Sequence, residues 1–154
     1  MSNGSFGTVK IMGQLLGIAR VARRLGPLIP LQEARVTATE GIEGDFRGVK
    51  LGRQITILFR EGWEDACAEL GQELPWVTRR ANLFVEGVIT PHEGGRLKIG
   101  SLLLEVTQET QPCQLMDKAR QGLRAALKPH WRGGVCCRVV EGGTIDVGDG
   151  VQSL

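Results

Sequence analysis

The chain has 154 residues, enough for one domain with a sizeable apolar core, and we interpret residues 1–154 as a single domain whose residues 1–7 form a flexible N-terminus. Its net charge of +2 is far below that of a dedicated nucleic-acid-binding protein, which excludes nucleic acid as the main partner. No apolar stretch of about 18 residues predicts a membrane span. The first residues lack the layout of a secretion signal, so we expect a cytoplasmic protein.

The four cysteines are expected to be reduced thiols, as is usual in the cytoplasm. They are Cys67, Cys113, Cys136 and Cys137. None forms a Cys-x-x-Cys pair, and the chain has only two histidines. A structural zinc site is therefore not expected.

The N-terminal part combines short strands with a glycine-rich loop. Alternating apolar residues over positions 9–18 predict a strand that is bent or bulged at a glycine, and residues 35–39 predict a second strand. Three glycines in residues 41–48 indicate a loop with special backbone angles. Its acid and base, Asp45 and Arg47, either bind a ligand or pair with each other.

A strand and a helix follow in the middle of the chain. Residues 54–59 predict a strand, after which the apolar residues recur at helical spacing up to Leu70. Gly71 is suited to end that helix, and Cys67 lies on its apolar stripe, so we assign Cys67 to core packing.

Two adjacent arginines, Arg79 and Arg80, stand before a strand predicted at residues 83–88. They either hold an anion through charge-assisted hydrogen bonds or form a solvated basic edge that prevents sheet pairing. His92 follows in a loop rich in glycine and is expected to be exposed.

Cys113 lies between a strand at residues 102–107 and a helix over residues 115–127, directly after Pro112. Backbone donors at a helix start stabilise negative charge, which favours a thiolate. A thiolate is both a nucleophile and a ligand for soft metals. The alternative is that Cys113 is a small apolar residue packed at the helix start.

The last segment again favours strands. Alternation over residues 135–140 places Cys136 and Cys137 on opposite faces of one strand, so we interpret both as structural. Residues 141–144 predict a hairpin turn into a strand at residues 145–147. Seven or eight short strands thus outnumber two helices. The predicted fold is mainly β with a few helices, an α+β closed or nearly closed β-barrel of about seven strands.

An ordered set of motifs extends from about residue 8 to the end of the chain. The segments are GIEGD (41–45), QITIL (54–58), RRANLFVEG (79–87), LKIG (97–100), QPCQL (111–115), RGGV (132–135) and EGGTIDVGD (141–149). Together they resemble the MOSC domain family, named for the C-terminal domain of molybdenum cofactor sulfurase. The chain resembles a short, stand-alone member of that family.

The resemblance implies a MOSC-like barrel and a pterin-based molybdenum cofactor. The cysteine of the family's Pro-Cys motif is Cys113 here, which makes Cys113 the implied molybdenum ligand and catalytic residue. An Arg-x-Asn element that holds the pterin and its phosphate matches Arg80 and Asn82, and Arg79 and Arg47 are weaker candidates. Arg47 stands where many relatives carry a histidine. A planar guanidinium suits a phosphate, and a soft thiolate suits molybdenum.

By the same resemblance, the chain is an oxidoreductase that reduces N-hydroxylated small molecules. No flavin, haem or iron–sulfur motif is evident, so a separate protein is expected to donate the electrons. A glycine-rich sheet edge permits a homodimer. Two alternatives remain: Cys113 carries a persulfide during maturation of a cofactor or metal–sulfur cluster, or the chain is a non-catalytic cofactor-binding module. Binding of pyridoxal phosphate is a further function found at the level of the family.

Overall fold

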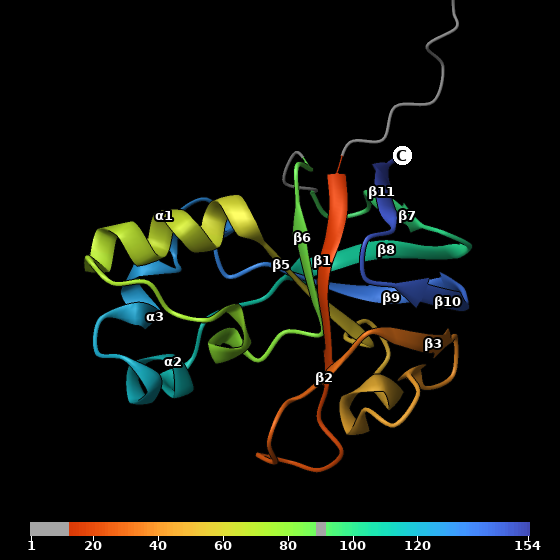
Figure 1. The fold of residues 1–154 in the computed structure, drawn as a ribbon, viewed down its shortest axis with the longest axis horizontal. Helices are drawn as coiled ribbons and strands as arrows, with labels where there is room; N and C mark the ends of the chain where they lie inside the picture. The colour runs from red at the N-terminus through yellow and green to blue at the C-terminus, as the bar shows by residue number, and fades with distance from the viewer. Residues whose placement is uncertain (1–12, 89–91) are drawn as a thin grey trace, which may run out of the picture.

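A closed barrel of seven strands forms the centre of the computed structural model, which describes residues 13–88 and 92–154 (Figure 1). The order around the barrel is β1, β11, β7, β8, β9, β5, β6 and back to β1. Among the described strands, β5 and β6 are the one pair that runs parallel. The strands are β1 (Gly13–Arg20), β5 (Ile55–Phe59), β6 (Leu83–Glu86), β7 (Arg96–Ile99), β8 (Leu102–Glu109), β9 (Val135–Glu141) and β11 (Gly150–Ser153). The prediction of a mainly β fold with a barrel of about seven strands is confirmed.

The first barrel strand carries the predicted irregularity. The register of β1 against β6 shifts between Leu15 and Gly17. A Cβ at Gly17 would lie 2.6 Å from the Trp76 ring, so a glycine lets this bulge pass close to the indole. Residues 9–12 of the predicted strand, and the N-terminus expected to be flexible (1–7), lie outside the described residues.

Four short strands lie outside the barrel. Strand β2 (Ile29–Leu31) pairs with β1, while β10 (Gly143–Asp146), β3 (Glu33–Thr37) and β4 (Gly41–Ile42) form a separate sheet. The predicted hairpin at residues 141–144 is therefore wrong, because β9 and β10 belong to different sheets. A Cβ at Gly142 would lie 2.5 Å from the carbonyl oxygen of Val36, so the glycine allows the chain to cross onto β3.

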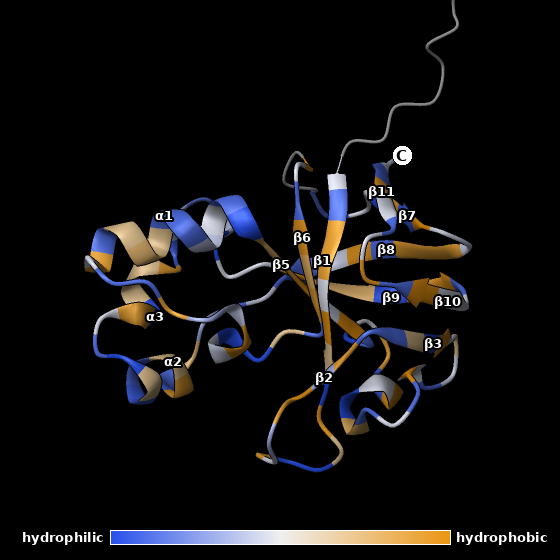
Figure 2. Cartoon of the chain, in the orientation of Figure 1, coloured by the Kyte–Doolittle hydropathy of each residue, from blue (hydrophilic) through white to orange (hydrophobic). Residues whose placement is uncertain are grey.

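The strand alternation divides the apolar residues between two cores. Ile55, Ile57 and Phe59 belong to the core inside the barrel, whereas Leu58, on the opposite face of β5, belongs to a second core under the helices. Hydrophobic residues are accordingly prominent along β5, β6, β8 and β9 (Figure 2). This arrangement leaves the outward-facing Thr56 beside a large surface cavity.

The helices cover one side of the barrel (Figure 1). Their buried face includes Trp63, Cys67, Met116 and Leu123, which confirms the core position predicted for Cys67. The helices are α1 (Arg60–Leu70), α2 (Gln114–Ala119) and α3 (Leu123–Ala126), with single 3-10 turns η1 (Phe46–Val49), η2 (Trp76–Arg79) and η3 (Pro129–Trp131). Gly71 ends α1 in the left-handed conformation, as expected. None of the described helices is long and apolar enough to cross a membrane.

The single helix predicted over residues 115–127 is wrong, since the chain turns between α2 and α3. The backbone is extended at Arg120 and left-handed at Gly122, with φ of 92°. A carboxylate oxygen of Asp117 accepts hydrogen bonds from the backbone N–H groups of Gly122 and Arg124. This bonding starts a new helix and lets Leu123 turn into the outer core.

Gly134 provides a test of how closely β9 approaches β5. Its φ is 94°, and a Cβ there would lie 2.1 Å from the carbonyl oxygen of Ile57. Gly134→Ala is expected to lower the free energy of unfolding by about 3 kcal/mol or more, because strand backbone must move. Gly71→Ala, whose site is also left-handed but open, should cost about 1 kcal/mol. Urea denaturation measures both, and equal losses would contradict the close approach.

Candidate functional site

The site begins at the end of β8, where the chain passes through Pro112 to Cys113. Cys113 is the residue before α2, its backbone is extended, and its side chain is exposed and lines a cavity of about 900 Å³. The other three cysteines are buried. Of the four thiols, Cys113 is the one positioned to meet a ligand.

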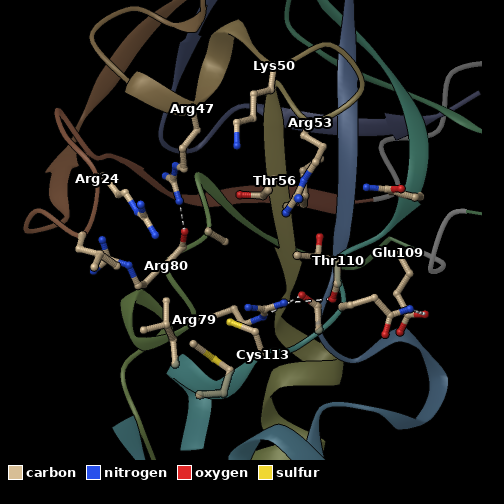
Figure 3. A pocket seen from close by; sticks show the side chains of 18 of the residues that line it. Arg24, Arg47, Lys50, Arg53, Thr56, Arg79, Arg80, Glu109, Thr110 and Cys113 are labelled. Carbon is tan, nitrogen blue, oxygen red and sulfur yellow. Dashed lines mark hydrogen bonds between the residues drawn. The ribbon is translucent and has the colours of Figure 1, made fainter. Parts of the chain in front are cut away.

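Arg79 forms part of the cavity wall beside Cys113 (Figure 3). The residue is only 8% exposed, and its guanidinium donates from Nε to the carbonyl oxygen of Gly133 and from Nη2 to that of Thr110, both at 3.0 Å. Burial lowers the pKa of Arg79 and nearby Arg53 adds to that effect, whereas Cys113 and another thiol oppose it. The group nevertheless remains a cation at neutral pH.

Glycine is required where Arg79 meets the turn before β9. A Cβ at Gly133 would lie 2.6 Å from the Thr110 carbonyl oxygen and 3.2 Å from Nη2 of Arg79. The two glycines of the RGGV segment therefore have a steric explanation. Gly133 leaves room for the Arg79 guanidinium, and Gly134 leaves room for the backbone of β5.

Arg80 follows in a left-handed conformation with φ of 66°, which ends η2. Its Nη2 donates to the carbonyl oxygen of Gly26 at 2.7 Å, and its own carbonyl oxygen accepts from Nη1 of Arg47 at 2.6 Å. Partial burial and the charge of Arg47 lower the pKa of Arg80. These bonds connect the strained residue to two loops of the cavity wall.

Asp45 organises the glycine-rich loop from a buried position. It forms an ion pair with Arg47 at 2.9 Å, accepts from the backbone N–H of Arg47 at 2.8 Å, and accepts from Nδ2 of Asn82 at 2.5 Å. Burial alone would raise the pKa of Asp45, but the bonds to Arg47 and Asn82 outweigh burial and lower it. The acid and base of this loop therefore pair with each other, which was one of the two alternatives.

Asn82 occupies a different place from the other predicted site residues. It is 1% exposed and does not line the cavity. Besides the bond to Asp45, its Nδ2 donates to the carbonyl oxygen of Ala19, and its Oδ1 accepts from the backbone N–H of Thr56 at 3.0 Å. Asn82 thus holds the cavity wall, and its predicted direct contact with a pterin stays an untested prediction.

The cavity lining is strongly basic. Six cations converge on the cavity from several sides, opposed by the single carboxylate of Glu109 (Figure 3). The lining has a formal excess of five positive charges, although the whole chain has only +2. The rest of the chain therefore has a net charge of about −3. The six cations are Arg24, Arg47, Lys50, Arg53, Arg79 and Arg80.

Four of the five predicted site residues meet at this cavity: Cys113, Arg79, Arg80 and Arg47. Sequence reasoning missed Arg24, Lys50 and Arg53, which lie in loops that reach the cavity through contacts between distant parts of the chain. The one local signal was that each lies within two residues of a glycine. Cys136 and Cys137 are buried on opposite faces of β9, and burial raises the pKa of Cys137. Within residues 13–88 and 92–154, no three His, Cys, Asp or Glu side chains form a metal-binding cluster.

Comparisons with known proteins agree with this fold. A family model described as the MOSC domain matches residues 37–152. The structure is similar to that of the YuaD protein from Bacillus subtilis, with a TM-score of 0.79 and 17% identity over 92% of this chain and 96% of that one. No match is found among curated proteins.

Two YiiM proteins of known structure are also similar. For YiiM from Geobacillus stearothermophilus the TM-score is 0.67 and the identity 18%, covering 94% of this chain and 74% of that one. For YiiM from Escherichia coli the values are 0.69 and 17%, covering 92% and 69%. At these identities the likeness concerns the fold alone.

The Asp45–Arg47 pair makes a pH-dependent contribution to stability. The pKa of Asp45 is lowered in the folded protein. The stabilising contribution is therefore fully present above the ordinary pKa of 3.8 and is lost as the pH falls through the lower, folded-state pKa. Asp45→Asn is expected to lower the free energy of unfolding by about 3 kcal/mol at pH 7, and the difference from the unsubstituted protein should shrink below about pH 4. Urea denaturation across pH measures this. Asp65→Asn, at an exposed position of α1, serves as the control, and a pH-independent difference would contradict the assignment.

The accessibility of Cys113 can be tested by alkylation. Brief treatment of the folded protein with iodoacetamide should add about one group per chain, at Cys113, because only exposed thiols react readily. Cys113→Ser should remove this reaction, and unfolding in denaturant should expose all four thiols. Peptide mass spectrometry locates the adducts. Equal native labelling of Cys67 and Cys113 would show that the described exposure is wrong.

Proposed function

The chain belongs to the MOSC domain family, and we propose that it binds a pterin-based molybdenum cofactor and reduces N-hydroxylated small molecules. The observation that supports this most directly is an exposed thiol, Cys113, in the same cavity as the Arg79 and Arg80 guanidinium groups. Molybdenum accepts a soft thiolate ligand, and guanidinium groups suit the phosphate of the pterin.

The lining fits such a cofactor in charge and in chemistry. Cys113 would hold the metal, and Arg80 would bind the phosphate with the guanidinium that its bond to Gly26 already orients. Arg79 would supply a fixed positive charge beside Cys113. Arg47 would position Arg80 by donating a hydrogen bond to the Arg80 carbonyl oxygen. When bound, the cofactor would supply two-electron redox chemistry, and the chain would provide binding and orientation.

The proposed reaction breaks an N–O bond. An N-hydroxylated amine takes up two electrons and two protons, and it becomes the amine and one water molecule. Since the chain has no motif for a flavin, haem or iron–sulfur centre, we propose that a separate donor protein supplies the electrons. A homodimer is also part of the proposal, in which a second copy of the chain would cover the exposed side chains at the cavity.

A sulfur-carrier function is the second candidate. It is favoured by the contrast between the exposed Cys113 and the three buried cysteines, because a persulfide must reach an acceptor. A non-catalytic module that holds a phosphorylated cofactor would use the same basic cavity without needing the thiol. Loss of activity in Cys113→Ser would not separate the first two functions, so composition has to be measured.

Molybdenum content separates these functions. Protein made in a host that synthesises the cofactor should contain about one molybdenum per chain, and Cys113→Ser should lose most of it because the thiolate ligand is gone. Arg80→Gln should reduce the content several-fold, whereas Arg120→Gln, an exposed residue that does not line the cavity, should not. Elemental analysis measures each ratio, together with an assay for hydroxylamine reduction.

Each other outcome favours a different function. Metal-free protein with sulfane sulfur on Cys113 would support the carrier. Retention of the cofactor at full affinity by Cys113→Ala would support the non-catalytic module.

A further inference from the structure

The cations that line the cavity fall into two groups. Arg47, Arg79 and Arg80 form the inner group, and each donates hydrogen bonds to protein oxygens that fix its guanidinium. Arg24, Lys50 and Arg53 form the outer group and are exposed. None of these three has an ion pair among the described residues, and residues 1–12 and 89–91 contain no Asp or Glu. The outer group therefore has charge that the described chain does not neutralise.

The outer group is held at the cavity by two anchored segments. Lys50 and Arg53 follow η1, in a segment whose Gly52 carbonyl oxygen accepts a hydrogen bond from the Thr107 hydroxyl of β8. Arg24 lies in the loop that Arg80 holds through Gly26. Figure 3 shows Lys50 and Arg53 pointing into the cavity from one side and Arg24 from another. The three side chains are thus presented to the same space from separate walls.

The charge on this lining exceeds what one phosphate neutralises. A phosphate monoester carries about −1.5 to −2 at neutral pH, whereas the lining keeps an excess of four positive charges once Asp45 neutralises Arg47. One phosphate would leave about two positive charges close together, which is unfavourable in a partly enclosed cavity. The neighbouring Leu25 and Phe46 are 65% and 37% exposed and also line the cavity, so they offer apolar contact to the organic part of a ligand.

From this we infer that Arg24, Lys50 and Arg53 form a second subsite, which binds a phosphate group of an organic phosphate in addition to the pterin phosphate. The inference rests on the proposed function for the identity of the first phosphate. The second phosphate belongs either to a phosphorylated substrate or to a nucleotide extension of the cofactor. Both sources have the same recognition chemistry, a phosphate attached to an organic group.

The first test uses inorganic phosphates as probes of the full chain. Isothermal titration at low salt should show that pyrophosphate binds at least about tenfold more tightly than orthophosphate, because it engages more cations. Lys50→Gln combined with Arg53→Gln should weaken pyrophosphate binding about tenfold. The matched control, Arg35→Gln combined with Lys98→Gln, removes two exposed cations outside this cavity and should leave the affinity unchanged. Equal affinity of the cavity variant and the unsubstituted protein, or an equal loss in the control, would overturn the inference.

The second test separates the two sources of phosphate. If the cofactor has a nucleotide extension, acid hydrolysis of the molybdenum-loaded protein should release a nucleoside monophosphate, and the Lys50/Arg53 double variant should contain less molybdenum. If the substrate is phosphorylated, no nucleotide is released and the molybdenum content is unchanged. In that case the variant should have a raised KM for a phosphorylated hydroxylamine but not for its unphosphorylated analogue.

The failure of the proposed function would be distinguishable from the failure of the subsite. A chain that binds no molybdenum but loses pyrophosphate affinity in the cavity variant would contradict the cofactor and support the subsite. A chain that binds molybdenum, shows no nucleotide, and has the same KM ratio with and without Lys50 and Arg53 would retain the cofactor and lose the subsite.

Discussion

The site depends on one buried cation that has no carboxylate partner in the described part of the chain. The guanidinium of Arg79 is satisfied instead by the carbonyl oxygens of Thr110 and Gly133. Removing a charge from water is costly unless fixed dipoles replace the water, so these two bonds have to be kept. They join η2, the end of β8 and the turn before β9. Cys113 follows Thr110 closely, so the bonds that hold the positive charge also fix the segment that presents the thiol.

The neighbouring arginines show how the same residue type serves two purposes. Arg47 is neutralised by Asp45, and its role is to hold the Arg80 carbonyl group. Arg80 has no carboxylate partner among residues 13–88 and 92–154, and its left-handed backbone directs the side chain to the cavity. Two residues later, Asn82 turns inward and binds Asp45. The Arg-x-Asn pattern therefore combines Arg80, which lines the cavity, with Asn82, which fixes the glycine-rich loop through Asp45.

The parts of the fold that follow from local pattern were predictable from the sequence. The strand before α1, the helix itself and its end at Gly71 needed only periodicity and one glycine. The separation of β9 from β10 was not predictable, because it depends on Gly142 lying against Val36, which is distant in sequence. Strand β11 was also missed, although its pairing with β1 and β7 closes the barrel. A strand of four residues has too little alternation to be identified without its partners.

The same distinction applies to the site. Cys113 could be singled out because a proline, a strand end and a helix start coincide there, and the motif order connected it with Arg79 and Arg80. Lys50 and Arg53 could not, because their place in the lining depends on a bond between Thr107 and Gly52 across the fold. Asn82 could be singled out with Arg80 as an Arg-x-Asn element, yet its burial and its three protein partners could be known only from the packed structure.

This chain and YuaD share a fold, with a TM-score of 0.79, at only 17% sequence identity. The fold therefore does not require most of the residues of either sequence. A barrel core tolerates many apolar substitutions as long as volume and alternation are kept, so similar folds persist in dissimilar sequences. The cavity here is lined largely by loop residues, which can change without disturbing that core. On the proposed function, ligand choice would therefore depend on the number and placement of the unpaired cations around Cys113, and the barrel would keep the loops that carry them in a fixed relation.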